Sequence, residues 1–273
     1  MEEKLRSGII ITVFSTASAV GKTLLGVNMA AGLAETGYKV CIIDLDLQFG
    51  DVCNYLHLFP LKTIYDAQKT AEEKPDNIDS SEYILSYTSG DTAFSVLAAP
   101  LKLEQAYNVS TQAVIAVLTA LRREYDYIVI DTTAAFSDLN LAVMDMSTII
   151  TFVGIVDFIP TIKNMKIGYD TMRGIGYDKN KIRLVLNRSN SRTNIEVQDV
   201  EQLLEERFYH VLPNHFSTAI ESIHKGVPLI IGNEVTPLSK SLQELIAKYT
   251  NRLQEKHTND GASLSNWIKQ LFQ

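Results

Sequence analysis

The 273-residue sequence has little of several features that would indicate a particular class of protein. Its two cysteines, Cys41 and Cys53, are too few for a disulfide framework or a cysteine metal site, so we expect reduced thiols in or near the core. The apolar run near the start, Gly8–Phe14, is too short for a signal peptide and far too short to cross a bilayer. We therefore expect a cytoplasmic protein.

Positive charge is also scarce. Lys and Arg number 25 against 32 Asp and Glu, which gives a net charge of −7. Arg183, Arg188 and Arg192 form no part of a wider basic patch, so we expect loop charge in solvent and no nucleic-acid partner. The five histidines have no metal-ligand spacing. What the chain does have is a hydrophobic content of 46%, which is typical of a globular protein with a substantial core.

Apolar runs of strand length alternate with longer amphipathic segments. This order predicts an α/β fold, doubly wound, with a mostly parallel sheet and helices on both faces. We assign residues 1–256 to this domain, 257–261 to a linker and 262–273 to a C-terminal tail helix. The predicted strands are Ile9–Phe14, Val40–Asp44, Phe94–Ala98, Tyr127–Asp131, Thr148–Val153, Ile182–Asn187 and His210–Leu212. The predicted helices are Lys22–Glu35, Thr111–Glu124, Pro160–Ile175, Ile195–Arg207 and Leu238–Gln254.

The stretch "IIITVFSTASAVGKTLL", residues 9–25, resembles a phosphate-binding loop between a strand and a helix. It ends in Gly21-Lys22-Thr23, where the helix start supplies free N–H groups, Lys22 can reach phosphates and Thr23 can bind Mg²⁺. The first glycine of the pattern is missing, because Thr16 stands there. A threonine with positive φ would be strained, so the start of the loop must either differ from the usual shape or carry strain.

Three carboxylates follow predicted strands. Asp44 and Asp46 end the segment "IIDLD", and Asp131 ends "YIVID". Ligands of open α/β sheets bind beyond the carboxyl ends of the strands, so these carboxylates are expected near the loop. Together with Gly-Lys-Thr they predict a Mg²⁺–nucleotide site.

With these motifs the chain resembles the MinD/ParA family of deviant Walker A ATPases, over most of residues 8–250. Further segments that carry the resemblance are "CIIDLDLQFGDV" at 41–52, "YDYIVIDT" at 125–132, "LVLNR" at 184–188 and "VLPNHFSTAIESIHKGVPL" at 211–229. Within the family, "DLDLQFGDV" and "RLVLNRSNSR" are most similar to the CpaE/TadZ branch, which assembles Flp/Tad pili.

The resemblance implies a role for each residue that matches a family motif. Lys22 would contact the phosphates of ATP, and Asp46 would orient or activate the attacking water. Thr23, Asp44 and Asp131 would hold Mg²⁺. Asn187 would read the adenine edge with Arg188 beside it, and Pro213 would shape the base pocket. The loop residues expected at the nucleotide are Ser18, Ala19, Val20, Gly21, Lys22, Thr23 and Leu24. Simple capping roles remain open for Asn187, at its strand end, and for Asp44.

The family pattern K-G-G-x-G-K-T-[TS] also identifies what is missing. The lysine that reaches the partner's phosphates is replaced by Ala17, and the following glycines by Ser18 and Ala19. Thr133 and Ala134 replace the prolines after the last aspartate. We therefore expect a homodimeric, ATP-binding platform with weak or absent hydrolysis that localises a pilus assembly or secretion apparatus. The alternatives are a dimeric scaffold that has lost nucleotide binding, and an active positioning ATPase for division, flagella or DNA.

The tail has one apolar face, because its large residues recur at helical spacing. Attraction of this face to a membrane would make the protein peripheral on the inner face of the cell membrane. A partner protein and the parent domain are the other surfaces that it could cover. The residues of the face are Leu264, Trp267, Ile268, Leu271 and Phe272.

Overall fold

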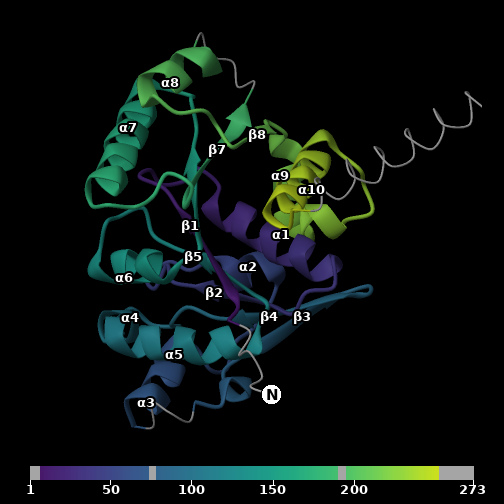
Figure 1. Cartoon of the computed structure of the whole chain (residues 1–273). Coiled ribbons are helices and arrows are strands. Elements are labelled where there is room, and N and C mark those ends of the chain that lie inside the picture. The colour runs from purple at the N-terminus through teal and green to yellow at the C-terminus, as the bar shows by residue number, and fades with distance from the viewer. Residues whose placement is uncertain (1–6, 74–77, 190–194, 252–273) are drawn as a thin grey trace, which may run out of the picture.

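The structure is a computed structural model that describes residues 7–73, 78–189 and 195–251. Eight strands in this part form one sheet, in the order β3-β4-β2-β5-β1-β6-β7-β8 (Figure 1). All neighbouring pairs are parallel except β3 and β4, which form an antiparallel hairpin at one edge. The strands are β1 (Ile9–Phe14), β2 (Val40–Asp44), β3 (Leu85–Ser89), β4 (Thr92–Leu97), β5 (Tyr127–Asp131), β6 (Ile149–Gly154), β7 (Ile182–Ser189) and β8 (His210–Pro213).

Helices cover both faces of this sheet, which confirms the predicted doubly wound α/β fold. Figure 1 shows α1, α9 and α10 on one side and α5, α6, α7 and α8 on the other. The helices are α1 (Lys22–Glu35), α2 (Val52–Leu56), α3 (Ile64–Glu73), α4 (Leu103–Tyr107), α5 (Thr111–Glu124), α6 (Asp138–Met146), α7 (Ile159–Gly174), α8 (Val197–Leu204), α9 (Phe216–Lys225) and α10 (Pro237–Tyr249), with short 3-10 helices η1 (Ser80–Glu82) and η2 (Leu229–Ile231).

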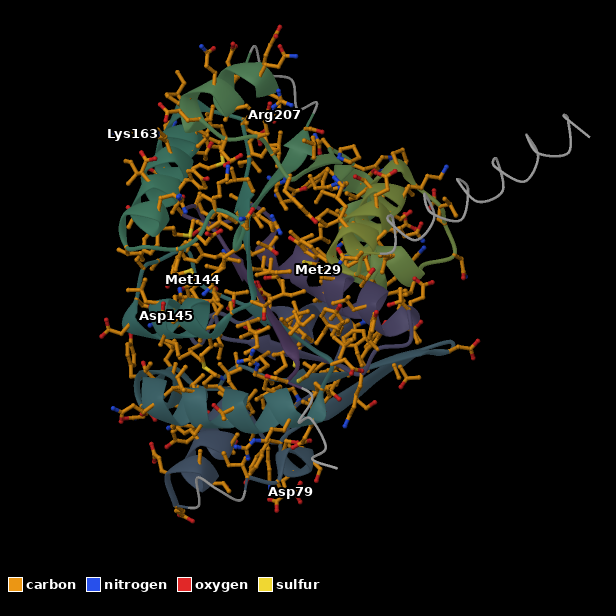
Figure 2. All side chains as sticks on the ribbon, in the orientation of Figure 1. Met29, Asp79, Met144, Asp145, Lys163 and Arg207 are labelled. Carbon is orange, nitrogen blue, oxygen red and sulfur yellow. The ribbon has the colours of Figure 1, made fainter. Side chains whose placement is uncertain are left out.

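The core is divided by the sheet, as the alternation of side chains along a strand requires. In β1, Ile11 and Val13 pack on the side of α1, whereas Ile10 and Phe14 pack on the opposite side. All five residues of β2 and of β5 are buried. Figure 2 shows the side chains filling both layers, with the fully buried Met29 of α1 inside the molecule. The central strands therefore hold the loops at their carboxyl ends in fixed positions.

Some elements differ from the sequence prediction, and each difference has a local reason. The strand β3 was not predicted, because "LSYTS" is a short, polar edge strand with one buried side chain, Tyr87. The helices α2 and α4 were missed because five residues are too few to show a helical period. Helix α8 is shorter than the predicted 195–207, because Glu205 has a left-handed conformation (φ 55°) that ends the helix.

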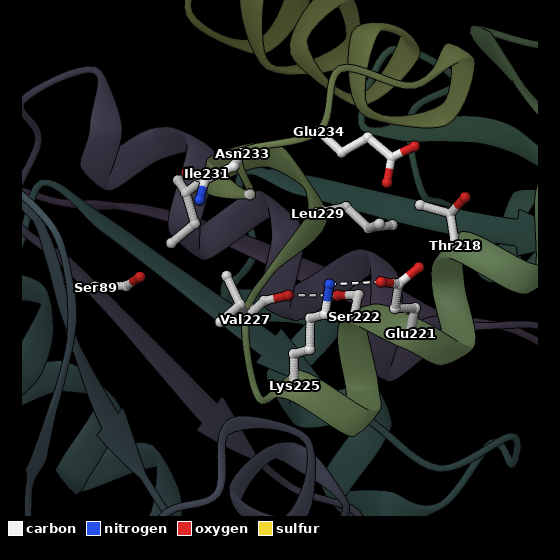
Figure 3. A pocket seen from close by; sticks show the side chains of 11 residues that line it. Ser89, Thr218, Glu221, Ser222, Lys225, Val227, Leu229, Ile231, Asn233 and Glu234 are labelled. Atoms are coloured by element: carbon white, nitrogen blue, oxygen red, sulfur yellow. Dashed lines mark hydrogen bonds and ion pairs between the residues drawn. The ribbon is translucent and has the colours of Figure 1, made fainter.

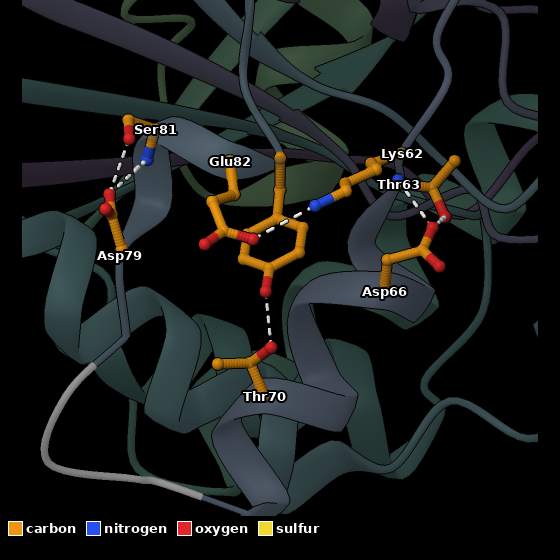
Figure 4. Close-up of polar contacts among 8 residues, drawn as sticks. Lys62, Thr63, Asp66, Thr70, Asp79, Ser81 and Glu82 are labelled. Carbon is orange, nitrogen blue, oxygen red and sulfur yellow. Dashed lines mark hydrogen bonds and ion pairs between the residues drawn. The ribbon is translucent and has the colours of Figure 1, made fainter.

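Polar contacts join the segment before α3 to η1 (Figure 4). Lys62 forms an ion pair of 3.0 Å with Glu82, and the Thr63 N–H donates to Asp66 at the start of α3. Thr70 of α3 bonds to the hydroxyl of Tyr83. These contacts connect α3 and the segment before it to η1 and the residue after it, on the side of the sheet away from α1.

The predicted linker 257–261 and tail 262–273 lie outside the described residues, so their assignments stay predictions. Within the described ranges, no helix is long and apolar enough to cross a membrane.

Candidate functional site

The loop between β1 and α1 has the shape of a phosphate cradle although its first glycine is absent. Gly21 is the N-cap of α1 and has φ 95°, and Ala19 has φ 58°. Thr16 is not among the described residues with positive φ. The left-handed turn therefore lies at Ala19, and the strain expected for Thr16 does not arise. The Ser15 hydroxyl donates to the Ala17 carbonyl over 2.6 Å and fixes the start of the loop.

Thr16 instead packs against α7. A Cβ added to Gly168 would lie 2.3 Å from the Thr16 methyl group, so the helix approaches the loop closely at this glycine. Thr16, which stands where the loop pattern has its first glycine, therefore contacts a glycine of α7. The contact sets the distance between α7 and the phosphate loop.

The end of β7 holds the loop from the other side. The β7–β8 register shifts between Leu186 and Ser189, and Arg188 has φ 54° within this bulge. Asn187 Nδ2 donates to the Val20 carbonyl over 2.8 Å, and its Oδ1 accepts from the Arg188 N–H over 2.9 Å. Arg188 Nη2 donates to the Ala19 carbonyl over 2.9 Å. Asn187, predicted to read the adenine edge, and Arg188 beside it therefore both bind the loop backbone, and Asn187 acts as a clamp on it.

On the opposite side, the first turn of α1 meets the end of β5. Thr23 Oγ1 donates to Asp131 Oδ2 over 2.6 Å. The other carboxylate oxygen, Oδ1, is buried and has no hydrogen-bond partner. Burial raises the pKa of Asp131 to about 6, although the Thr23 hydroxyl and the Lys22 charge lower it. A buried carboxylate with one unpaired oxygen, beside a threonine hydroxyl and a lysine, fits a bound cation.

Asp44 is buried at the end of β2, and both of its oxygens are used within the chain. Oδ1 accepts from the Asp46 N–H over 3.1 Å and Oδ2 from the Val52 N–H over 3.0 Å. Burial and the nearby Asp131 raise the pKa of Asp44 well above its usual range. Its contacts in this structure are those of a loop cap, since it fixes the segment that carries Asp46.

No group of three or more His, Cys, Asp and Glu in the described ranges could hold a metal. A magnesium ion that binds with a nucleotide commonly has one or two protein ligands and takes the others from phosphate oxygens and water. The chemistry of Thr23 and Asp131 therefore fits an ion that arrives with a nucleotide.

A cavity of about 630 Å³ opens at this edge of the sheet. Of the predicted residues, nine line it: Ser18, Ala19, Gly21, Lys22, Thr23, Leu24, Asp46, Asn187 and Arg188. Val20, Asp44, Asp131 and Pro213 do not line it. Sequence reasoning missed the rest of the lining, which comprises Gln48, Phe49, Asp51, Asn54, Tyr55, Thr133, Ala134, Asn214, His215, Phe216, Ala219, Ile220, Ile223 and Leu238.

Helix α9 forms the apolar wall of this cavity. Its apolar residues at i, i+3, i+4 and i+7 are Phe216, Ala219, Ile220 and Ile223, a spacing that would have identified the helix from the sequence. None of the four is buried, and the only buried residue of α9 is Ser222. The phosphate loop thus lies next to an apolar surface that the described part of the chain leaves open.

Residues 11–229 match the model of the CobQ/CobB/MinD/ParA nucleotide binding domain. The chain belongs to this family. It is 26% identical over 238 residues to the septum site-determining protein MinD of Helicobacter pylori, covering 81% of this chain and 84% of that protein.

Solved structures share the fold. The ParA family ATPase of Chlorobium tepidum superposes with a TM-score of 0.80 at 16% identity, covering 88% of this chain and 98% of that one. MinD of Pyrococcus horikoshii in complex with Mg-ADP gives 0.75 at 18% identity, covering 89% and 96%. The cradle and the Thr23–Asp131 pair therefore lie in the fold that these proteins share.

Proposed function

We propose that this protein is an ATP- and Mg²⁺-dependent dimeric switch with weak or absent hydrolysis. The observation that carries the proposal is the unpaired, buried oxygen of Asp131 beside Thr23, at the N-terminus of α1. A nucleotide with its cation supplies both what this oxygen lacks and what the free N–H groups of the helix start attract.

In this proposal the loop N–H groups and Lys22 bind the phosphates, and Thr23 and Asp131 hold Mg²⁺. When bound, Mg²⁺ would neutralise charge on the phosphate oxygens. Asp46 lines the cavity and would orient the attacking water, while Asp44 keeps its segment in place through the N–H groups of Asp46 and Val52.

Slow hydrolysis follows from the position of Ala17. Its side chain packs against the core on the side of α1 and carries no charge. Among the cavity-lining residues, Lys22 and Arg188 are the only lysine or arginine. A further cation at the transferring phosphoryl group is worth orders of magnitude in rate, so its absence predicts a long-lived ATP state.

Dimerisation is supported by the apolar surface beside the loop. Phe49 and Phe216 are 72% and 61% exposed and both line the cavity, together with the open stripe of α9. Large exposed apolar groups around a polar site indicate a protein interface. A second copy covering this edge would bury them and enclose the nucleotide.

The cellular role that we propose is a platform for a pilus assembly or secretion apparatus, as in the CpaE/TadZ branch. It rests on the segments "DLDLQFGDV" and "RLVLNRSNSR". The tail 262–273 would bring the dimer to the inner face of the membrane. Liposome sedimentation of the full chain against a chain ending at Asp260 tests this, and equal sedimentation of the two would remove the membrane role.

Two other functions compete with this one. A dimeric scaffold without nucleotide would fit the loss of loop glycines, and a positioning ATPase for division, flagella or DNA would fit the relatives named MinD and ParA. Turnover that a partner protein stimulates strongly would favour the positioning ATPase.

Calorimetry with ATP and Mg²⁺, on the native chain and on Lys22→Ala, decides between the switch and the scaffold. Light scattering on the same samples gives the mass. We expect micromolar binding that the variant loses, together with a shift from monomer to dimer. Absence of binding by the native chain, with a dimer already formed, would establish the scaffold instead.

A further inference from the structure

The loop between β5 and α6 borders the cavity with two residues, Thr133 and Ala134. The family pattern has prolines at these positions, and a proline has no N–H group. Both residues here have one, and Thr133 adds a hydroxyl group. This loop therefore has three hydrogen-bond donors where two prolines would have none.

A buried amide fixes the orientation of the Thr133 hydroxyl. Asn140 of α6 is 1% exposed, and its Nδ2 donates to the Ala135 carbonyl over 2.7 Å and to the Thr133 carbonyl over 3.3 Å. Carbonyl oxygens only accept, so the part of the amide that faces them is its NH2 group. The same group lies 2.9 Å from Thr133 Oγ1. This oxygen must therefore accept, which directs the hydroxyl hydrogen away from Asn140.

The three donors of this loop have no acceptor in the part of the chain that the structure describes. The Thr133 hydroxyl accepts from Asn140 but donates to no group of residues 7–73, 78–189 and 195–251. The N–H groups of Thr133 and Ala134 likewise make no hydrogen bond within these ranges. The chain bends at Ala134, and successive N–H groups in a turn commonly bind anions. The ligand that suits this loop is therefore an anion.

Two contacts place this loop beside the phosphate-binding loop. The Thr132 hydroxyl donates to the Val13 carbonyl over 2.8 Å, near the end of β1. Asp131, two residues before Thr133, accepts from Thr23 at the start of α1. Because neighbouring strands are about 5 Å apart, the donors lie at the end of the cavity where we expect the cation. A cation bound to a nucleoside triphosphate bridges its last two phosphates, which brings the terminal phosphate to this end.

We infer that Thr133 and Ala134 bind the terminal phosphate of a nucleoside triphosphate, and that Asn140 is the positioning residue that directs the Thr133 hydroxyl. The inference rests on the proposed nucleotide binding and specifies how the site distinguishes a triphosphate from a diphosphate, which lacks this phosphate. The three donors are neutral, so they add affinity for the triphosphate without supplying the charge that is missing at Ala17. They therefore favour a long-lived ATP state.

Calorimetry on the full chain tests this with two ligands, each with Mg²⁺: a non-hydrolysable ATP analogue and ADP. Thr133→Val keeps the shape and the N–H group but removes the hydroxyl, whereas Thr133→Ser keeps both donors. Ala134→Pro removes the second N–H group, and Asn140→Leu removes the amide. Thr119→Val is the matched control, since Thr119 is exposed on α5 and does not line the cavity.

We expect the native chain to bind the ATP analogue at least about tenfold more tightly than ADP. Thr133→Val and Ala134→Pro should each weaken the analogue on the order of tenfold, which is the usual effect of losing a hydrogen bond to a charged group, and leave ADP unchanged. Thr133→Ser and Thr119→Val should bind both ligands as the native chain does. Asn140→Leu should lose the preference for the analogue, and thermal unfolding checks that it is folded.

Equal weakening of both ligands in Thr133→Val would make Thr133 a general support of the cavity and overturn the inference alone. So would unchanged binding in Thr133→Val, a Thr133→Ser variant that behaves like Thr133→Val, or a native chain that binds ADP as tightly as the analogue. The Thr133 variants decide these outcomes even if Asn140→Leu does not fold. Failure of the native chain to bind either ligand would overturn the proposed function itself.

Discussion

Thr23 and Asp131 are 108 positions apart in the sequence, and the hydroxyl of one donates to the carboxylate of the other over 2.6 Å. The bond joins the first turn of α1 to the end of β5. It orients one carboxylate oxygen inward and leaves the second unpaired. Burying that unpaired oxygen lowers the free energy of unfolding, and this effect can be measured.

The first prediction concerns Asp131→Asn. The pKa of Asp131 is about 6 in the fold against 3.8 for the free side chain, so the folded state holds the proton more tightly. The free energy of unfolding of the ligand-free chain should therefore fall as the pH rises from about 4 to 6. At pH 7.5 the variant, which has no charge to bury, should be more stable by about 3 kcal/mol, since the pKa differs by about 2.2 between the folded and the free side chain and each unit corresponds to about 1.4 kcal/mol.

Denaturant unfolding between pH 4.5 and 7.5 measures this difference. Asp91→Asn is the control, since Asp91 is exposed. The raised pKa of Asp44 acts in the same direction, so some slope should remain in the variant. With Mg²⁺ and ATP the order should reverse, because only the native chain keeps the charged ligand. A native chain whose stability rises over this pH range would contradict the prediction.

The second prediction separates a clash from backbone strain at Gly21. Both Gly21 and Gly37 have φ near 94°, at 95° and 93°. A Cβ on Gly21 would lie 2.5 Å from Asn187 Nδ2, whereas a Cβ on Gly37 would meet nothing within 4 Å. Gly37→Ala should cost about 1 kcal/mol of stability and leave ligand binding intact.

Gly21→Ala should cost more than Gly37→Ala, since it must also displace the clamp that Asn187 makes on Val20. It should lose nucleotide binding. Thermal unfolding and calorimetry on both variants measure the two effects, and equal losses of stability would show that the Asn187 contact has no energetic weight.

The third prediction concerns a buried polar network behind the cavity. Asn28 of α1 donates to the Tyr55 hydroxyl, which lies 2.5 Å from the Ser222 hydroxyl of α9. Ser222 in turn donates to the Val227 carbonyl, at the wall of a neighbouring cavity of about 270 Å³ (Figure 3). Tyr55→Phe should lower the free energy of unfolding by about 1–3 kcal/mol, because it removes two buried hydrogen bonds, those to Asn28 and Ser222.

Chemical denaturation measures this loss, with Tyr107→Phe as a control at an exposed tyrosine. Ser222 is the only fully buried residue of α9, so the network anchors the helix together with the core contacts of Ala219 and Ile223. Hydrogen exchange in α9 should therefore increase more than in α5. A loss confined to global stability, with no change specific to α9, would remove this anchoring role.

The sequence predicted what depends on local pattern. The bounds of β1, β2, β5, α1 and α5 agree with the structure, because continuous apolar runs identify the buried strands, Gly21-Lys22-Thr23 identifies the start of α1, and α5 has apolar residues at helical spacing. It also predicted the gathering of Lys22, Thr23, Asp46 and Asn187, since strand ends of a parallel sheet meet at one edge.

What it could not predict depends on contacts between distant segments. The positive φ at Ala19 rather than Thr16 accompanies a hydrogen bond from Arg188, in the bulge of β7, to the Ala19 carbonyl, a contact that no periodicity reveals. A capping role for Asp44 was open from the sequence, but its partner Val52, eight residues later, is a contact that no local pattern identifies. The apolar wall of α9 was missed because residues 211–229 were compared only with the family motif. The helical spacing of Phe216, Ala219, Ile220 and Ile223 is nevertheless visible in the sequence.

The last prediction tests why hydrolysis should be slow. Ala17→Lys restores the charge that the family pattern has at this position, and Ala17→Met is the control of similar length without charge. If the missing lysine limits turnover, the lysine variant should hydrolyse ATP about tenfold faster than the methionine variant. This is less than the 10³–10⁵ that a well-placed cation supplies in related chemistry, because the Ala17 side chain packs toward the core. Steady-state phosphate release measures the rates, and the lysine variant with Lys22→Ala added should return to background. Equal rates in the two single variants, with ATP binding and dimer mass unchanged, would mean that the altered loop as a whole limits hydrolysis rather than the missing charge.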